Sequence, residues 1–340
     1  MKKIILAFAV LATVLSSCKK DEDNNSQPMS TQSEYFLVAN RGSSTVTVFD
    51  ASTLNKEMDI TLPGTGADPT YLAYSKERAM FYVGDFANQK LYAYGASDFM
   101  LKHSIDIQEG AFHMWLSDAS DQLWVNNIVS KTTSVVSLSS NSVIETIGLP
   151  TQDINLTTDA VQHDVVLSAN GDYAFITILD GTDVSYVVQY ATADFSYMRH
   201  ATIGGDAHLL IVDDKLFATS QEGNAITVFK QSDLSEVSTI SINAPHGVAY
   251  AGSYFYTAQT PAKGLGVISL SDYSVVSTQE ALYDAPHNLA VNEAGSRLFL
   301  SHSGGTATKV VLYEISGASL TKKAEMDSGT NPFGVLYFKY

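Results

Sequence analysis

Cysteine is almost absent from this chain. Its 340 residues include a single cysteine, Cys18. One thiol excludes an internal disulfide and every motif that needs two cysteines. In exported proteins, structural cysteines are usually paired in disulfides. If this chain is exported, its lone cysteine near the start therefore indicates an attachment point.

Basic residues are also scarce. Lysine and arginine together number 20 against 36 acidic residues, and the formal net charge is −16. Nucleic-acid binding depends on clustered basic side chains that contact phosphates, and no basic stripe occurs here. We therefore expect no nucleic-acid partner. The four arginines are Arg41, Arg78, Arg199 and Arg297.

Familiar catalytic motifs are missing as well. The chain has no GxSxG nucleophile elbow, no GxxxxGK[ST] phosphate loop, no CxxC pair and no calcium-binding loop pattern. These absences argue against a serine hydrolase with such an elbow and against a P-loop nucleotidase. Any functional site must be assembled from residues that are distant in the sequence.

The N-terminus has the pattern of an export signal. Two lysines, a short apolar run and small residues lead to Cys18, so residues 1–17 are expected to be a signal peptide. Leu15–Ser16–Ser17–Cys18 resembles the lipobox of bacterial lipoproteins, which implies lipidation of Cys18. The polar residues 18–33 are expected to form a flexible tether. Their lysine-then-acidic start resembles signals for the outer face of the outer membrane, where we expect the protein to be anchored.

The rest of the chain is a repeat. Apolar residues make up 45% and aromatic residues 10% of the sequence, and frequent Val, Thr, Tyr and Phe favour strands. A strand, a turn and a second strand recur about 38 to 50 residues apart, which is typical of a radial repeat. The seven copies begin near Thr70, His113, His163, His208, His246, His287 and Phe333.

The two ends of the chain complement each other. The first folded segment, residues 34–62, has three strand patterns and lacks the opening strand of the later repeats, whereas Asn331–Phe338 supplies one strand and then stops. Joining them gives a seventh four-stranded blade and removes open sheet edges. We predict an all-β domain over residues 34–340: a seven-bladed β-propeller of four-stranded antiparallel blades, closed by the N- and C-terminal strands.

Several segments carry a family resemblance. Val46–Leu54 and Ile226–Leu234 resemble blade endings of YVTN/YncE-type seven-bladed propellers, as do Ser168–Thr177 and Val291–His302. Gln162–Asp183 and the C-terminal tail are similar to 6-phosphogluconolactonase-type propellers. The resemblance covers nearly all of residues 34–340 and implies the fold; blade repeats say little about activity.

Histidine marks the start of the predicted inner strand in five blades. Inner strands of a propeller line its central channel, so these imidazoles are expected to form an arc at one mouth. Asp164, Asp206 and Asp284 lie close by in sequence and are candidates to orient them. His302 either lines the same mouth or lies on a surface loop, and His103 and His200 are expected to be solvated. The five histidines are His113, His163, His208, His246 and His287.

Three roles are open for this arc. Imidazole is a common ligand of zinc and copper, so the arc is a candidate zinc or copper site. The histidines could instead brace neighbouring blades, or they could form a metal-free rim that binds a small ligand. The recurrence of histidine does not distinguish these roles, because a residue that braces neighbouring blades would also recur from blade to blade.

Together these features favour a monomeric, lipid-anchored binding protein of the cell envelope. Its ligand or envelope partner would contact the histidine-lined mouth, and we expect a binding module rather than an enzyme. The alternative is a lactonase-like hydrolase or another metal-dependent enzyme at the same site. The sequence assigns no catalytic residue.

Overall fold

The structure, a computed structural model, describes residues 33–340. The predicted signal peptide and Cys18, with all of the tether except Ser33, lie outside the described residues. Within the described part, no helix is long and apolar enough to cross a membrane.

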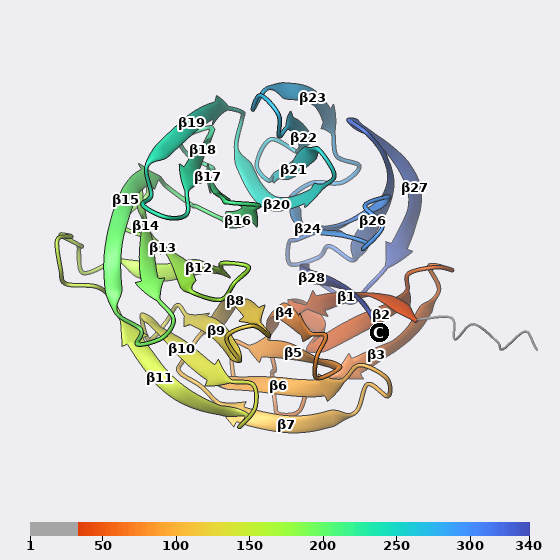
Figure 1. Cartoon of the computed structure of the whole chain (residues 1–340). Helices are drawn as coiled ribbons and strands as arrows, with labels where there is room; N and C mark the ends of the chain where they lie inside the picture. The colour runs from red at the N-terminus through yellow and green to blue at the C-terminus, as the bar shows by residue number, and fades with distance from the viewer. Residues whose placement is uncertain (1–32) are drawn as a thin grey trace, which may run out of the picture. The chain divides into compact units, whose positions relative to one another are not determined.

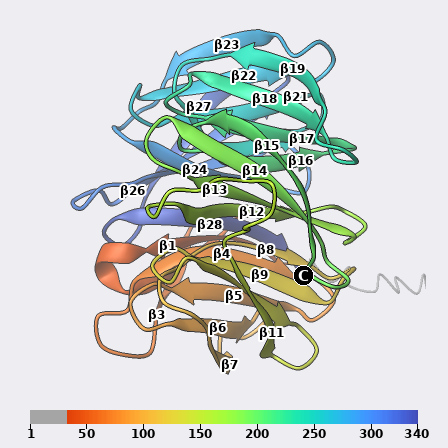
Figure 2. The same cartoon turned by 90° about the vertical axis from the view of Figure 1, so that its left-hand side faces the viewer.

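Seven four-stranded antiparallel sheets surround a central axis (Figure 1). In each sheet the strands follow one another from the axis outward, and the outermost strand lies at the rim. Seen from the side, the blades are stacked around the ring with their faces packed together (Figure 2). The predicted seven-bladed propeller is confirmed.

Blade 1 closes the ring from both ends of the chain. Its order is β28-β1-β2-β3, so the last strand of the chain is the innermost strand of the blade that contains the first. β28 pairs antiparallel with β1, with Leu37 opposite Leu336. The predicted closure by terminal strands is confirmed. The elements are β1 (Glu34–Asn40), a short 3-10 turn η1 (Arg41–Ser43), β2 (Thr45–Asp50), β3 (Lys56–Thr61) and β28 (Pro332–Lys339).

Blades 2 to 4 each use four consecutive strands. Blade 2 has β4 (Pro69–Ser75), β5 (Met80–Asp85), β6 (Lys90–Gly95) and β7 (Leu101–Asp106). Blade 3 has β8 (Ala111–Ser117), β9 (Gln122–Asn127), β10 (Thr132–Ser137) and β11 (Ser142–Gly148). Blade 4 has β12 (Val161–Leu167), β13 (Tyr173–Leu179), β14 (Val184–Ala191) and β15 (Tyr197–Gly204).

Blades 5 to 7 repeat this order. Blade 5 has β16 (Leu209–Val212), β17 (Lys215–Ser220), β18 (Ala225–Lys230) and β19 (Glu236–Ser241). Blade 6 has β20 (Pro245–Ala251), β21 (Tyr254–Gln259), β22 (Gly264–Ser269) and β23 (Val275–Glu280). Blade 7 has β24 (Pro286–Val291), β25 (Arg297–His302), β26 (Lys309–Ser316) and β27 (Ser319–Asp327).

The core lies between the blades. The middle strands are almost wholly buried because both their faces pack on neighbouring blades, whereas outer strands such as β7 and β23 are largely exposed. Each of the seven blade interfaces holds one apolar cluster. Phe338 of β28 is buried at the interface of blades 1 and 2, in contact with Phe81 and Tyr74.

Replacement of Phe338 by alanine is expected to lower the free energy of unfolding by about 3–5 kcal/mol, because it leaves a cavity where the last strand packs on blade 2. Urea denaturation measures the change. Val276→Ala on the exposed face of β23 serves as the control and should cost less than about 0.5 kcal/mol. Equal stabilities of the two variants would contradict a core contribution from the closing strand.

Candidate functional site

A β-bulge shapes the start of most inner strands. In β4, β8, β12, β20, β24 and β28 the pairing with the next strand shifts by one residue, and two residues lie inside the irregularity. Such bulges bend a strand and redirect side chains. Here they lie at the end of the channel where the inner strands begin, and they place two successive residues of each strand at the axis.

The five histidines occupy two bulge positions, which corrects the predicted single equivalent position. His163, His246 and His287 lie at the first position, whereas His113 lies at the second, together with Asp164 and Asn288. β16 has no bulge. The backbone N–H of His208 donates to Thr219 Oγ1, as that of Asp164 does to Thr177 Oγ1, so His208 also takes the second position.

The imidazoles meet at the axis and pack on one another. Ring centroids of His113, His163 and His208 lie 4.8–4.9 Å apart, and those of His208 and His246 lie 4.0 Å apart. His287 continues the series 4.7 Å from His246. The exposed fraction of each of these residues is only 3–7%. These five residues, termed the histidine cluster below, therefore close the channel instead of lining an open mouth.

Two of the three predicted carboxylates reach the histidine cluster. Asp164 Oδ1 lies 3.1 Å from His113 Nδ1, and Asp164 Oδ2 lies 3.6 Å from His208 Nδ1. The oxygens of Asp206 lie 3.8–3.9 Å from Nε2 atoms of the cluster. The prediction for Asp284 is wrong, since its carboxylate is 92% exposed and pairs with Lys263 Nζ at 3.2 Å.

Burial determines the charge state of the cluster. It lowers the pKa of His163, His246 and His287 well below the usual value, and that of His113 less strongly because Asp164 opposes the effect. Burial also acts on His208, but the carboxylates of Asp164 and Asp206 raise its pKa overall. Four rings are thus neutral imidazoles, the form that binds metals.

Asp164 is buried and remains ionised. Burial alone would raise the pKa of its carboxyl, but the imidazoles of His113 and His208 hold that pKa below its usual range. The backbone N–H groups of Val165 and Leu209 donate to it at 2.7 and 2.8 Å. These donors offset the cost of burying a carboxylate.

Aromatic rings that were not predicted from the sequence fill the rest of the space at the axis. Tyr71 packs on His113 with ring centroids 3.8 Å apart, and Phe333 packs on His287 at 4.1 Å. Phe112 contacts both Tyr71 and Phe333. The sequence signal that could have identified these rings is their location at, or directly next to, the repeated position where each inner strand begins. The guanidinium of Arg41 covers Phe333 at 4.9 Å and is paired with Asp68.

An axial cavity of about 330 Å³ lies on the other side of the histidine cluster. The second-position residues His113, Asp164 and His208 line it, while no first-position histidine does. Further along the inner strands, Trp115 and Tyr250 add partly exposed aromatic faces to its wall. The cluster therefore separates this cavity from the end of the channel where the inner strands begin.

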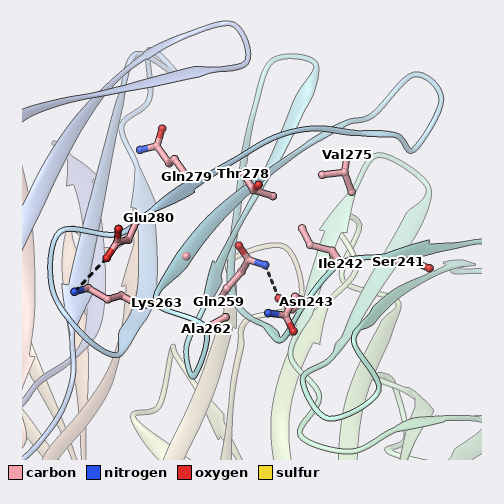
Figure 3. A pocket seen from close by; sticks show the side chains of 11 residues that line it. Ser241, Ile242, Asn243, Gln259, Ala262, Lys263, Val275, Thr278, Gln279 and Glu280 are labelled. Atoms are coloured by element: carbon pink, nitrogen blue, oxygen red, sulfur yellow. Dashed lines mark hydrogen bonds and ion pairs between the residues drawn. The ribbon is translucent and has the colours of Figure 1, made fainter.

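A second hollow, of about 530 Å³, lies between the outer parts of blades 5 and 6 (Figure 3). Its charged side chains are Lys263 and Glu280, which pair with each other at 3.4 Å. Gln259 Nε2 donates to the carbonyl of Asn243 across it. Both charged groups of this hollow are therefore already paired, and we assign no reaction to it.

Hydroxyl groups and imidazoles both link neighbouring blades near the axis. Thr70 Oγ1 donates to the carbonyl of Ala111 at 2.9 Å, and Ser301 Oγ donates to that of Phe333 at 2.7 Å. Imidazoles also make contacts between blades. His208 Nε2 and His246 Nε2 share a 3.0 Å hydrogen bond, His113 Nδ1 lies 3.1 Å from Asp164 Oδ1, and His163 Nδ1 lies a long 3.4 Å from Ala207 O. The histidine cluster therefore contributes to bracing, but Nε2 of His113 and Nδ1 of His246 take no part in it.

The three other histidines stay outside the cluster. His103 is exposed on β7, as expected, and His200 is half-buried on β15 with its Nδ1 2.8 Å from the hydroxyl of Tyr197. His302 is 1% exposed at the end of β25, neither on a surface loop nor in the axial cavity. Its Nδ1 faces the carbonyl of Asp284 at 3.2 Å.

Comparison with solved structures adds proteins of the same architecture. A Bacteroides fragilis protein proposed to be a 6-phosphogluconolactonase is 15% identical with a TM-score of 0.73, and covers 92% of this chain and 99% of its own. The periplasmic gluconolactonase of Pseudomonas aeruginosa is 15% identical with a TM-score of 0.72, covering 90% and 99%. The chain shares their seven-bladed fold.

At this level of identity, that likeness shows the fold alone. Kuenenia stuttgartiensis hydrazine synthase matches at a TM-score of 0.67 and 12% identity, over 83% of this chain and 92% of that one. One architecture thus serves unrelated chemistry. No protein-family model matches the sequence, and no curated protein is significantly similar to it.

His302 is expected to make stability depend on pH. Burial lowers its pKa to about 4, against about 6.5 in an unfolded chain, so unfolded molecules bind this proton first as the pH falls. Its contribution is complete above pH 6.5 and shrinks as the pH falls toward 4. When the pH is lowered from 7.5 to 5, the free energy of unfolding should therefore fall by about 2 kcal/mol less in His302→Gln than in the parent chain.

Urea titrations at the two pH values measure this difference. His103→Gln, at an exposed histidine of β7, should keep the parent pH dependence. Parallel losses in the His302→Gln variant and the parent chain would show that His302 does not contribute.

Proposed function

We propose that this protein is a binding module of the cell envelope that holds a divalent transition metal in its histidine cluster. The axial cavity beside the cluster receives a small ligand or a projecting group of a partner. The observation that carries the proposal is the convergence of buried, mostly neutral imidazoles from consecutive blades, with two carboxylates beside them.

The donor set fits a metal ion of the zinc or copper class. Ligand atoms of His113, His163 and His208 lie within 4.8 Å of one another, as do those of Asp206, His208 and His246. His113 Nε2 and His246 Nδ1 are buried and have no hydrogen-bond partner in the structure. Nitrogen donors with one or two carboxylates are typical of zinc sites. Bracing alone does not account for this arrangement, because it leaves these two buried ring nitrogens without a partner.

A lactonase-like reaction has less support. Polarising a lactone carbonyl requires a cation or oriented donors, and a phosphosugar would also require arginines. Neither arginine nor lysine lines the axial cavity in the described chain. The solved lactonases share the fold at a sequence identity too low to transfer their activity.

The envelope location rests on the N-terminal sequence. A signal-like segment that ends in Cys18 supports a lipid anchor, and residues 18–33 would then act as the tether to the propeller. A net charge of −16 is compatible with a solvent-exposed protein that binds small ligands rather than nucleic acid.

Zinc is expected to bind the full-length chain, purified in detergent without a polyhistidine tag, in a 1:1 ratio. At free zinc of 100 times Kd, binding should raise the free energy of unfolding by about 2.7 kcal/mol. His208 belongs to both groups of ligand atoms, so His208→Asn should weaken binding at least 100-fold. Isothermal titration calorimetry and metal content measure these effects.

The control is His103→Asn, at an exposed histidine outside the cluster. It should bind zinc as tightly as the parent chain. If neither zinc nor copper is retained or raises the melting temperature, the histidine cluster is a metal-free element and the metal proposal fails.

Cys18→Ala is expected to stop incorporation of labelled palmitate and to move the protein from the membrane fraction to the soluble fraction. The reason is that lipid on this residue is the proposed anchor. Ser26→Ala, within the tether, should change neither property. Membrane association that survives Cys18→Ala would rule out the lipid anchor.

A further inference from the structure

Within the histidine cluster, the geometry points to one four-ligand zinc site: we propose that Nε2 of His163, His208 and His246 and the carboxylate of Asp206 bind a single ion. This inference rests on the proposed metal binding and assigns its ligands. Asp206, expected from the sequence to orient a histidine, becomes a ligand itself. The ion would link blades 4, 5 and 6.

The separations from Asp206 to the three Nε2 atoms, and between the Nε2 atoms of His208 and His246, are close to those of a tetrahedral site. With Zn–N and Zn–O bonds of about 2.0–2.1 Å, tetrahedral ligand atoms lie about 3.3–3.4 Å apart. Asp206 Oδ1 is 3.8 Å from Nε2 of His163 and of His208, and Oδ2 is 3.9 Å from Nε2 of His246. The Nε2 atoms of His208 and His246 are 3.0 Å apart. Shifts of a few tenths of an ångström bring these four pairs to ligand spacing, and binding by His163 also requires its Nε2 to move toward those of His208 and His246.

The surroundings of two histidines favour binding through Nε2. His208 Nδ1 faces Asp164 Oδ2 at 3.6 Å, and His163 Nδ1 faces the carbonyl of Ala207 at 3.4 Å. A proton on each Nδ1 suits these acceptors. It leaves an Nε2 lone pair for the metal, which in His208 displaces the second proton, and this is the usual outer arrangement of zinc-bound histidine. Asp164 thus orients His208 from the cavity side.

The other group of three, His113, His163 and His208, fits less well. It includes no carboxylate to balance a divalent charge. His113 is held by Asp164 at 3.1 Å and by the ring of Tyr71. Asp206, by contrast, brings a negative charge and is 27% exposed, so an ion can reach it from the end where the inner strands begin.

Four protein ligands leave no open position, which is typical of structural zinc and not of catalytic zinc. First-position histidines do not line the axial cavity, so His163 and His246 lie on the far side of the cluster from it. The ion would therefore fasten three blades together, and a ligand in the cavity would not coordinate it.

The experiment compares matched pairs of variants of the full-length chain. Asp206→Asn is compared with Asp284→Asn, because Asp284 has a similar place in blade 7 but pairs with Lys263. His246→Asn is compared with His287→Asn, because both histidines occupy the first bulge position. His113→Asn tests the other group of three. Affinity for zinc, the visible spectrum of bound Co²⁺ and the melting temperature without metal are measured for each.

We expect Asp206→Asn and His246→Asn to weaken zinc binding at least tenfold and to change the tetrahedral Co²⁺ spectrum. Asp284→Asn, His287→Asn and His113→Asn should keep both, and metal-free melting identifies any variant that fails to fold. Loss of binding in His113→Asn, with Asp206→Asn unaffected, would overturn this ligand set while leaving metal binding intact. If the parent chain binds no metal, the proposed function itself fails.

Discussion

The antiparallel pairing of β1 with β28 holds the ring closed, and the geometry of the axis depends on that closure. Each blade interface buries one apolar cluster, so every blade needs a neighbour on both sides. With the terminal strands joined, all seven inner strands converge on one axis and their first residues come within contact distance. An open ring would expose two sheet faces and would separate the imidazoles.

At the axis, polar groups replace the apolar packing found between the blades. Burying five imidazoles and a carboxylate is costly unless each finds partners. Asp164 finds them in two backbone N–H groups and the rings of His113 and His208. Hydroxyl groups of Thr70 and Ser301 join the blades, while Nε2 of His113 and Nδ1 of His246 have no hydrogen-bond partner. The convergence of ring nitrogens and two carboxylates at the axis is the basis for proposing a metal.

The histidine cluster also divides the channel into two environments. On one side, Asp206 and the aromatic rings of Phe112 and Phe333 lie where the inner strands begin. On the other, second-position residues line the axial cavity, and Trp115 and Tyr250 contribute to its wall further along the inner strands. An ion bound on the first side and a ligand bound on the second would lie on opposite sides of His208. This division follows from bulges that place two successive residues of a strand at the axis.

The sequence by itself determined the blade count, the closure by terminal strands and the arrival of five histidines at the axis, because these follow from the repeat length and from where each strand starts. It did not determine that the histidines lie at two positions, since a bulge shifts pairing by one residue without a mark in the apolar pattern. Only the tertiary structure separated Asp206, which faces three Nε2 atoms, from Asp284, which turns to Lys263. The reason is that short loops with similar sequences take their direction from the blades packed against them.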